Sequence, residues 1–294
     1  MNSSKIARRV APMAGYLIPG YDDLMLLHRV NSLKDWPVPQ EGAQAATTAC
    51  VLDVETTGLD PAEDRVIEIA MALIEVDADG NVTSVVRQAA AQNDPGRPIP
   101  PLISKLTGIY DIDVTGKHVA ADVFIDIMSS ADVVISHNAA FDRKFVERLL
   151  PNIDHLPWAC TLADVDWLDG GFDGAKLGHL VNQMGRFTLA AHSAMDDVEA
   201  LVNLLDCHLP NGRTVIAEAL ANAAKPTVRI DAIDAAYDQR GHLKSRGYRW
   251  NPIRRFWWRE LPHQSTAAEL AWLHANNARV RPRQSNVTWH TRYQ

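Results

Sequence analysis

Two carboxylates stand two residues apart in an apolar run near the start of the chain. Asp53 and Glu55 alternate with Leu52 and Val54 within residues 51–58. Side chains on a strand alternate between faces, so a strand here places both acids on one side. Two such charges repel each other and are costly to desolvate, and oxygen ligands at this spacing suit Mg²⁺ or Mn²⁺. An exposed hairpin strand with two solvated acids explains the same octet equally well.

A third candidate ligand is Asp142, near the start of an amphipathic helix predicted over residues 141–150. Three- and four-residue spacing puts Asp142 on the same stripe of that helix as Phe145 and Val146. An aspartate on the inward edge of a helix needs a partner. N-capping is the alternative explanation, because Asn138 and Asp142 both lie near the helix start.

The fourth candidate is Asp197, in a helix predicted over residues 193–209. The helical period places Asp197 on the leucine stripe and therefore inward, whereas Asp196 is expected to cap the helix or meet solvent. His192 lies just ahead of this helix, in a loop rich in small residues. A lone histidine is more often structural than catalytic, but its position five residues before an inward aspartate favours a functional role.

Together these segments resemble the DEDDh 3′→5′ exonuclease family, which includes the proofreading epsilon subunit of bacterial DNA polymerase III. The resemblance covers about residues 48–208 and implies a ribonuclease-H-like fold. Three ordered blocks are far more specific than one short motif. The segments that carry it are residues 53–61, 137–142 and 192–197, with similar shorter pieces at 65–70, 106–109 and 160–162.

The resemblance also implies a mechanism. Asp53, Glu55, Asp142 and Asp197 would hold two divalent cations, Mg²⁺ or Mn²⁺, of which one activates a water and the other stabilises the leaving 3′ oxygen. His192 would act as the general base, a role suited to a side chain that titrates near neutrality. The product would be a nucleoside 5′-monophosphate released from a 3′ end.

Three further residues lie beside these ligands in the sequence and are candidates for holding the terminal nucleotide. They are Thr57, Gly58 and Asn138. Turn and helix-cap chemistry explains the same residue types equally well.

The elements expected to position these residues form an α/β domain. We predict a mixed sheet flanked by helices, in which an antiparallel three-strand meander precedes α/β units. An Asp-Gly turn at residues 79–80 separates two of the meander strands. The predicted strands are 49–55, 65–76, 81–90, 132–136 and 158–162, and the predicted helices are 124–129, 141–150, 176–184 and 193–209.

The flanking segments differ in composition. Residues 1–47 are expected to form an N-terminal arm with a short helix at 24–30, 48–210 the exonuclease domain, and 211–225 a linker. Residues 226–294 are expected to form a small α+β accessory domain. The net charge of -7 hides an asymmetry, since the chain from residue 227 onward has 12 Lys/Arg against 5 Asp/Glu. This asymmetry suggests a polyanionic partner for the C-terminal region.

Residues 243–260 of the accessory region interleave arginines with aromatic residues. Aromatic faces stack bases and arginines contact phosphates, so this region is expected to grip the nucleic-acid substrate. For the chain as a whole, single-stranded DNA or DNA 3′ ends are the expected substrate, and RNA is the alternative that the residues do not separate from DNA. The same residues also predict a hairpin of 248–250 and 256–258 with a packing helix at 267–275, in which the tryptophans form a small core.

The wider functional expectations follow from composition as well. Three widely spaced cysteines argue against a disulfide framework and for a reducing cytoplasm. No apolar run is long enough to cross a bilayer, so no membrane partner is expected. A polymerase or a repair protein is a candidate partner. The alternative is a nucleic-acid-binding or polymerase-associated subunit whose nuclease site is vestigial. A phosphotransfer enzyme is disfavoured, because the chain has no Gly-rich phosphate loop.

Overall fold

The computed structural model describes residues 16–18, 21–39, 45–188, 193–277 and 279–294. The chain divides into two compact units. The first extends to Ala223 and includes Tyr293 and Gln294, and the second is Ala224–Arg292. Among the described residues, no helix has both the length and the apolar character that crossing a membrane would require.

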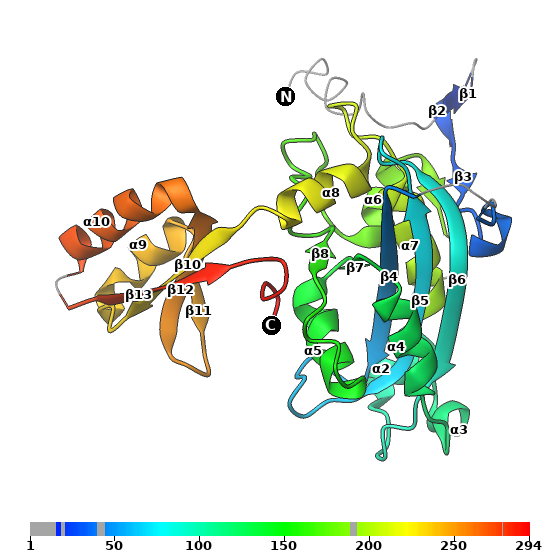
Figure 1. Cartoon of the computed structure of the whole chain (residues 1–294), viewed down its shortest axis with the longest axis horizontal. Helices are drawn as coiled ribbons and strands as arrows, with labels where there is room; N and C mark the ends of the chain where they lie inside the picture. The colour runs from blue at the N-terminus through cyan, green and yellow to red at the C-terminus, as the bar shows by residue number, and fades with distance from the viewer. Residues whose placement is uncertain (1–15, 19–20, 40–44, 189–192, 278) are drawn as a thin grey trace. The chain divides into compact units, whose positions relative to one another are not determined.

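A five-stranded mixed sheet forms the centre of the first unit (Figure 1). Its order is β6-β5-β4-β7-β8, with β5 antiparallel to β4 and β6, and β7 parallel to β4 and β8. This confirms the predicted mixed sheet, in which an antiparallel three-strand meander precedes α/β units. The strands are β4 (Thr47–Thr56), β5 (Val66–Val76), β6 (Val82–Gln92), β7 (Val133–Ser136) and β8 (Trp158–Cys160).

Helices cover both faces of this sheet. One face is apolar, and the other face carries the acids. Leu52 belongs to a buried cluster with Phe124 and Phe145, which come from α4 and α5. On the other face α7 packs against β4 and β5. Asp53 pairs there with Ala70, whose small side chain leaves room for a helix. The helices are α2 (Pro101–Thr107), α3 (Asp111–Val114), α4 (Ala121–Ser129), α5 (Ala139–Leu149), α6 (Leu177–Gln183), α7 (Ala194–Leu205) and α8 (Val215–Ala223).

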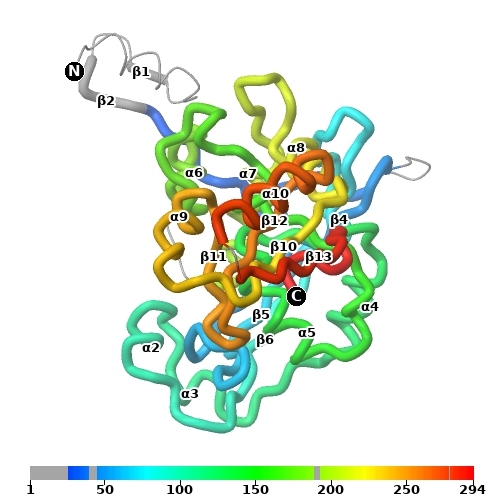
Figure 2. The backbone as a smooth tube through the Cα atoms, turned by 90° about the vertical axis from the view of Figure 1, so that its left-hand side faces the viewer, coloured from blue at the N-terminus to red at the C-terminus, as the bar shows by residue number. Residues whose placement is uncertain are grey.

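The connection from β6 to β7 runs through α2, α3 and α4. Of these, α2 and α3 lie beyond one end of the sheet, whereas α4 packs against β5 and β6 (Figure 2). The four predicted helices correspond to α4, α5, α6 and α7, although α7 ends at Leu205, earlier than expected.

The prediction of a short helix at residues 24–30 is wrong. The chain is extended there, in β2 (Tyr21–Leu26) and β3 (His28–Arg29), and β1 (Tyr16–Ile18) pairs with β2. β3 pairs in parallel with β9 (Arg186–Phe187), and the backbone N–H of His28 donates to the carbonyl of Gly185. A short apolar run fits a strand as well as a helix, and this distant pairing decides between them. A 3-10 turn follows at Leu33–Asp35.

The segment expected as a linker contains a helix. α8 occupies Val215–Ala223, where Val215, Ile216 and Ala219 are fully buried. This helix belongs to the first unit and packs against β8.

The second unit is a four-stranded antiparallel sheet in the order β11-β12-β10-β13. Its core joins Val228 and Ile230 of the sheet to Leu243 and Leu273 of the helices, with Trp257 partly buried against it. The predicted hairpin and helix are present, whereas β10 and β13 were not predicted. The elements are β10 (Thr227–Ile233), β11 (Arg249–Asn251), β12 (Phe256–Pro262), β13 (Arg281–Val287), α9 (Arg240–Ser245) and α10 (Thr266–Asn276), with 3-10 turns at Tyr237–Gln239 and His263–Ser265.

The three cysteines are free, as their spacing predicted. Cys50 and Cys160 are buried, and Cys207 is partly exposed. A cytoplasmic location stays a prediction.

Candidate metal centre

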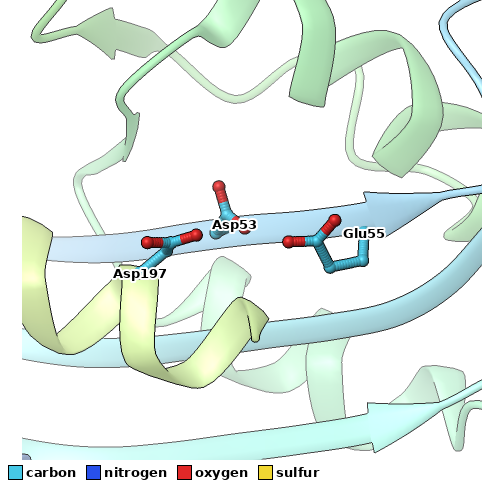
Figure 3. Close-up of side chains that lie close together, drawn as sticks. All are labelled: Asp53, Glu55 and Asp197. Atoms are coloured by element: carbon cyan, nitrogen blue, oxygen red, sulfur yellow. The ribbon is translucent and has the colours of Figure 1, made fainter. Parts of the chain in front are cut away.

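Three of the candidate ligands converge on the α7 side of the sheet. Asp53, Glu55 and Asp197 each offer a carboxylate oxygen within 4.8 Å of the others'. Figure 3 shows the two acids of β4 with the Asp197 side chain directed toward them from α7. Residues far apart in the sequence therefore form one acidic group, as the strand and helix periods predicted.

Local structure explains why each acid takes this place. Strand alternation puts Asp53 and Glu55 on the face opposite Leu52 and Val54, and Val54 is almost fully buried. Asp197 lies in the first turn of α7, where a negative charge interacts favourably with the helix dipole. Its backbone N–H donates to the carbonyl of residue 193 at 3.0 Å, which forms the first turn.

Asp142 lies beside this group but is not part of it. Its carboxylate is buried, with a residue exposure of 3%, in the first turn of α5. The charge of Asp142 nonetheless contributes to raising the pKa of both Asp53 and Glu55, so the four acids share one electrostatic environment. Asn138 begins α5 without a side-chain cap hydrogen bond and is exposed.

The electrostatics of the group favour protonation when no cation is bound. Loss of solvent, followed by the charges of Asp142 and Asp197, raises the pKa of Asp53 well above its usual range. The pKa of Glu55 rises to about 7 through burial and then through the charges of Asp197 and Glu68. Burial also raises the pKa of Asp142. A bound cation would stabilise the charged form of these carboxylates and so lower their pKa values again.

A fifth acid, Glu68, was missed by the sequence reasoning. It pairs directly with Glu55 across β4 and β5, and its Oε2 accepts a hydrogen bond from the backbone N–H of Ala194 at 2.8 Å. Ala194 is the first residue of α7. Alternation along β5 can indicate which face of the sheet Glu68 occupies. It does not predict that Glu68 lies beside Glu55, because this position depends on the register between β4 and β5.

Thr57 and Gly58 take part in a tight loop after β4. The Thr57 hydroxyl donates to Asp64 at 3.0 Å and accepts from the backbone N–H of Arg65 at 3.0 Å and from Arg97 at 2.8 Å. A Cβ on Gly58 would lie 2.4 Å from Oδ2 of Asp64. Both residues therefore shape the loop, and their role in holding a nucleotide stays a prediction. His192 lies outside the described residues.

The acidic group fits divalent cations. Within the described part of the chain, neither Asp53 nor Glu55 forms an ion pair with a lysine, arginine or histidine, so their charges are not compensated by such a side chain. Hard carboxylate oxygens at this spacing match the ligands that Mg²⁺ and Mn²⁺ prefer.

Comparison with known proteins adds a family. The model of the RNase_T family, described as Exonuclease, matches residues 50–205. The DNA polymerase III subunit epsilon of Treponema pallidum is 28% identical over 185 residues, which cover 60% of this chain and 83% of that protein. A PolC-type DNA polymerase III of Listeria welshimeri is 37% identical over 171 residues, which cover 55% of this chain and 11% of that protein.

Solved structures also show similarity. A crystal structure of E. coli exonuclease I in complex with a dT13 oligonucleotide has a TM-score of 0.45 and 21% sequence identity. The similarity covers 62% of this chain and 48% of that one.

Proposed function

Since this chain belongs to the RNase_T family of exonucleases, we propose that it is a metal-dependent 3′→5′ exonuclease acting on DNA. It hydrolyses the terminal phosphodiester bond and releases nucleoside 5′-monophosphates. The observation that carries this proposal is the convergence of Asp53, Glu55 and Asp197 in the matched region.

The proposed roles follow from the positions of the acids. Asp53, Glu55 and Asp197 would bind one divalent cation, and Asp142, buried beside Asp53, would contribute to a second. Bound Mg²⁺ or Mn²⁺ supplies Lewis-acid chemistry that lowers the pKa of water and stabilises charge on phosphodiester oxygens. His192 would accept the proton of the attacking water as general base.

DNA is the proposed substrate because both sequence relatives described above are named as DNA polymerase III proteins. The same names make a polymerase or repair protein the proposed partner class. Thr57, Gly58 and Asn138 are proposed to border the terminal nucleotide. For Thr57 this contact would be indirect, since its hydroxyl and its backbone N–H are already hydrogen-bonded.

The direct test uses DNA and RNA oligonucleotides labelled at either end, incubated with and without Mn²⁺. We expect a 5′-labelled DNA strand to shorten progressively from its far end, and a 3′-labelled strand to lose its label as a mononucleotide. EDTA should stop both reactions. Shortening from the 5′ end would contradict the direction. Without metal-dependent degradation of any substrate, the binding-subunit alternative would replace the proposed activity.

A further inference from the structure

The hairpin between β11 and β12 in the second unit carries three arginines without acidic partners. Arg249, Arg254 and Arg255 are exposed and form no ion pair with any residue that the structure describes. Six other arginines of the same unit each pair with an acid, namely Arg229, Arg246, Arg259, Arg281, Arg283 and Arg292. The uncompensated positive charge of the unit's sheet therefore gathers on this hairpin.

Exposed apolar side chains lie among these arginines. Trp250 is 47% exposed, with its ring 5.6 Å from that of Trp257, and Ile253 at the turn is 90% exposed. The Arg249 guanidinium lies 5.7 Å from the ring of Trp258. The Trp250 indole is tilted by 58° against its neighbour, and nearly half of the residue remains exposed to contact another planar group.

The position of the hairpin in the sheet makes it accessible along its length. Among the strands that the structure describes, β11 is one of the two edge strands of this sheet; it pairs with β12, whose other neighbour is β10. Successive residues of a strand point to opposite faces, so Arg249 and Trp250 flank the same edge. Arg254 and Arg255 follow in the turn. We name this surface, formed by Arg249, Trp250, Ile253, Arg254 and Arg255, the arginine edge.

We propose that the arginine edge binds single-stranded DNA, with the arginines contacting phosphates and a base stacking on Trp250. Arginine forms charge-assisted hydrogen bonds to phosphate oxygens, and aromatic rings stack on unpaired bases whatever their sequence. Paired bases within a duplex do not expose their faces to an indole. Stacking on Trp250 therefore favours single-stranded DNA over duplex DNA. This binding uses no residue of the acidic group and is therefore separable from the proposed hydrolysis.

A protective role for charged residues at a sheet edge is the competing explanation, since arginines there prevent edge-to-edge pairing between molecules. Exposed Trp250 and Ile253 do not fit that explanation, because apolar side chains on an edge promote association. They do fit a surface that a ligand covers.

The test measures anisotropy of a 5′-fluorescein-labelled oligothymidine of about twenty nucleotides, long enough to span one such site. The full chain is used in EDTA so that the probe stays intact. Replacing all three arginines (Arg249→Gln, Arg254→Gln, Arg255→Gln) should weaken binding about tenfold or more. It should also lower the slope of log affinity against log salt by about 2, since each single-strand phosphate contact contributes about 0.7. Trp250→Ala should weaken binding about tenfold with little change in slope.

The matched control removes three other exposed cations of the same unit (Arg240→Gln, Lys244→Gln, Arg279→Gln) and so makes the same change in net charge. We expect this variant to keep most of the affinity and the slope. Equal losses in both triple variants would show a general charge effect and overturn the proposal. Unchanged DNA binding with increased self-association of the first variant would also overturn it, in favour of edge protection.

Discussion

The carboxylate of Glu68 on β5 holds the first residue of α7 through the 2.8 Å hydrogen bond from the N–H of Ala194. Glu68 lies opposite Glu55, and Asp197 is three residues after Ala194 on the same helix. The strand acids and the helix acid are thus linked through one side chain that was not among the candidate ligands.

We therefore predict that Glu68 is a positioning residue. Glu68→Ala leaves the N–H of Ala194 without its acceptor and should lower kcat by about tenfold or more, comparable to losing a residue that orients a metal ligand. Glu68→Gln retains an acceptor and should recover much of this loss. Titration with Mn²⁺ by calorimetry should show weaker metal binding for the alanine variant. If both variants lose activity equally, the charge of Glu68 matters and not the hydrogen bond.

The two neighbouring aspartates of α7 provide a second prediction. Asp197→Ala removes a member of the acidic group and should lower metal-dependent nuclease activity by about a hundredfold or more. Asp196→Ala is the matched control, since Asp196 lies outside the group, and should stay within about threefold of the parent chain. Reversal of these two results would mean that the helix faces have been assigned the wrong way round.

The raised pKa of Glu55 predicts how the metal-free protein responds to pH. Its carboxyl keeps its proton up to about pH 7 when folded, whereas in the unfolded chain it loses the proton near the ordinary glutamate pKa of 4.5. The folded state therefore binds more protons between these values, and the free energy of unfolding falls as pH rises through the window.

Glu55→Gln isolates this contribution. In EDTA the variant should be more stable than the parent chain at pH 8, by on the order of 1–3 kcal/mol, and the difference should shrink toward pH 5. Chemical denaturation at each pH measures it. Saturating Mn²⁺ should stabilise the parent chain more than the variant. A difference that does not depend on pH would contradict the raised pKa.

The loop after β4 gives a prediction about stability. In Gly58→Ala the new methyl group would approach Oδ2 of Asp64 at 2.4 Å, and Asp64 is held by Thr57 and Arg97. We expect a destabilisation of about 1–3 kcal/mol, measured by thermal unfolding. Gly178 in α6 is the control, because nothing lies within 4 Å of its added Cβ. Gly178→Ala should stabilise by up to about 1 kcal/mol, as expected for alanine in a helix.

How far the site could be predicted depended on the range of the interactions. Alternation along one strand placed Asp53 and Glu55, and the period of one helix placed Asp197, because each signal lies within a single element. Glu68 could not be placed in this way, since its position beside Glu55 results from the register between two strands.

The fold shows the same division. β13 reads Arg-Pro-Arg-Gln-Ser-Asn-Val and has no strand pattern of its own; it is a strand because it pairs with β10, about fifty residues away. Thr57 is of a residue type common in turns, and the sequence does not show that its hydroxyl is hydrogen-bonded to Asp64, to the backbone N–H of Arg65 and to Arg97, which lies forty positions later.

The central position of β4 has a consequence for ion size. The backbone of this strand is hydrogen-bonded to β5 as far as Glu55 and to β7 as far as Val51, so the backbone positions from which the two acids project are held in place. Mg²⁺ requires ligands at about 2.0–2.1 Å, whereas Ca²⁺ takes about 2.3–2.6 Å and more of them. A pair of carboxylates on so rigid a support should accept Ca²⁺ only with distorted coordination. Calcium would then act as a competitor that occupies the centre without supporting turnover.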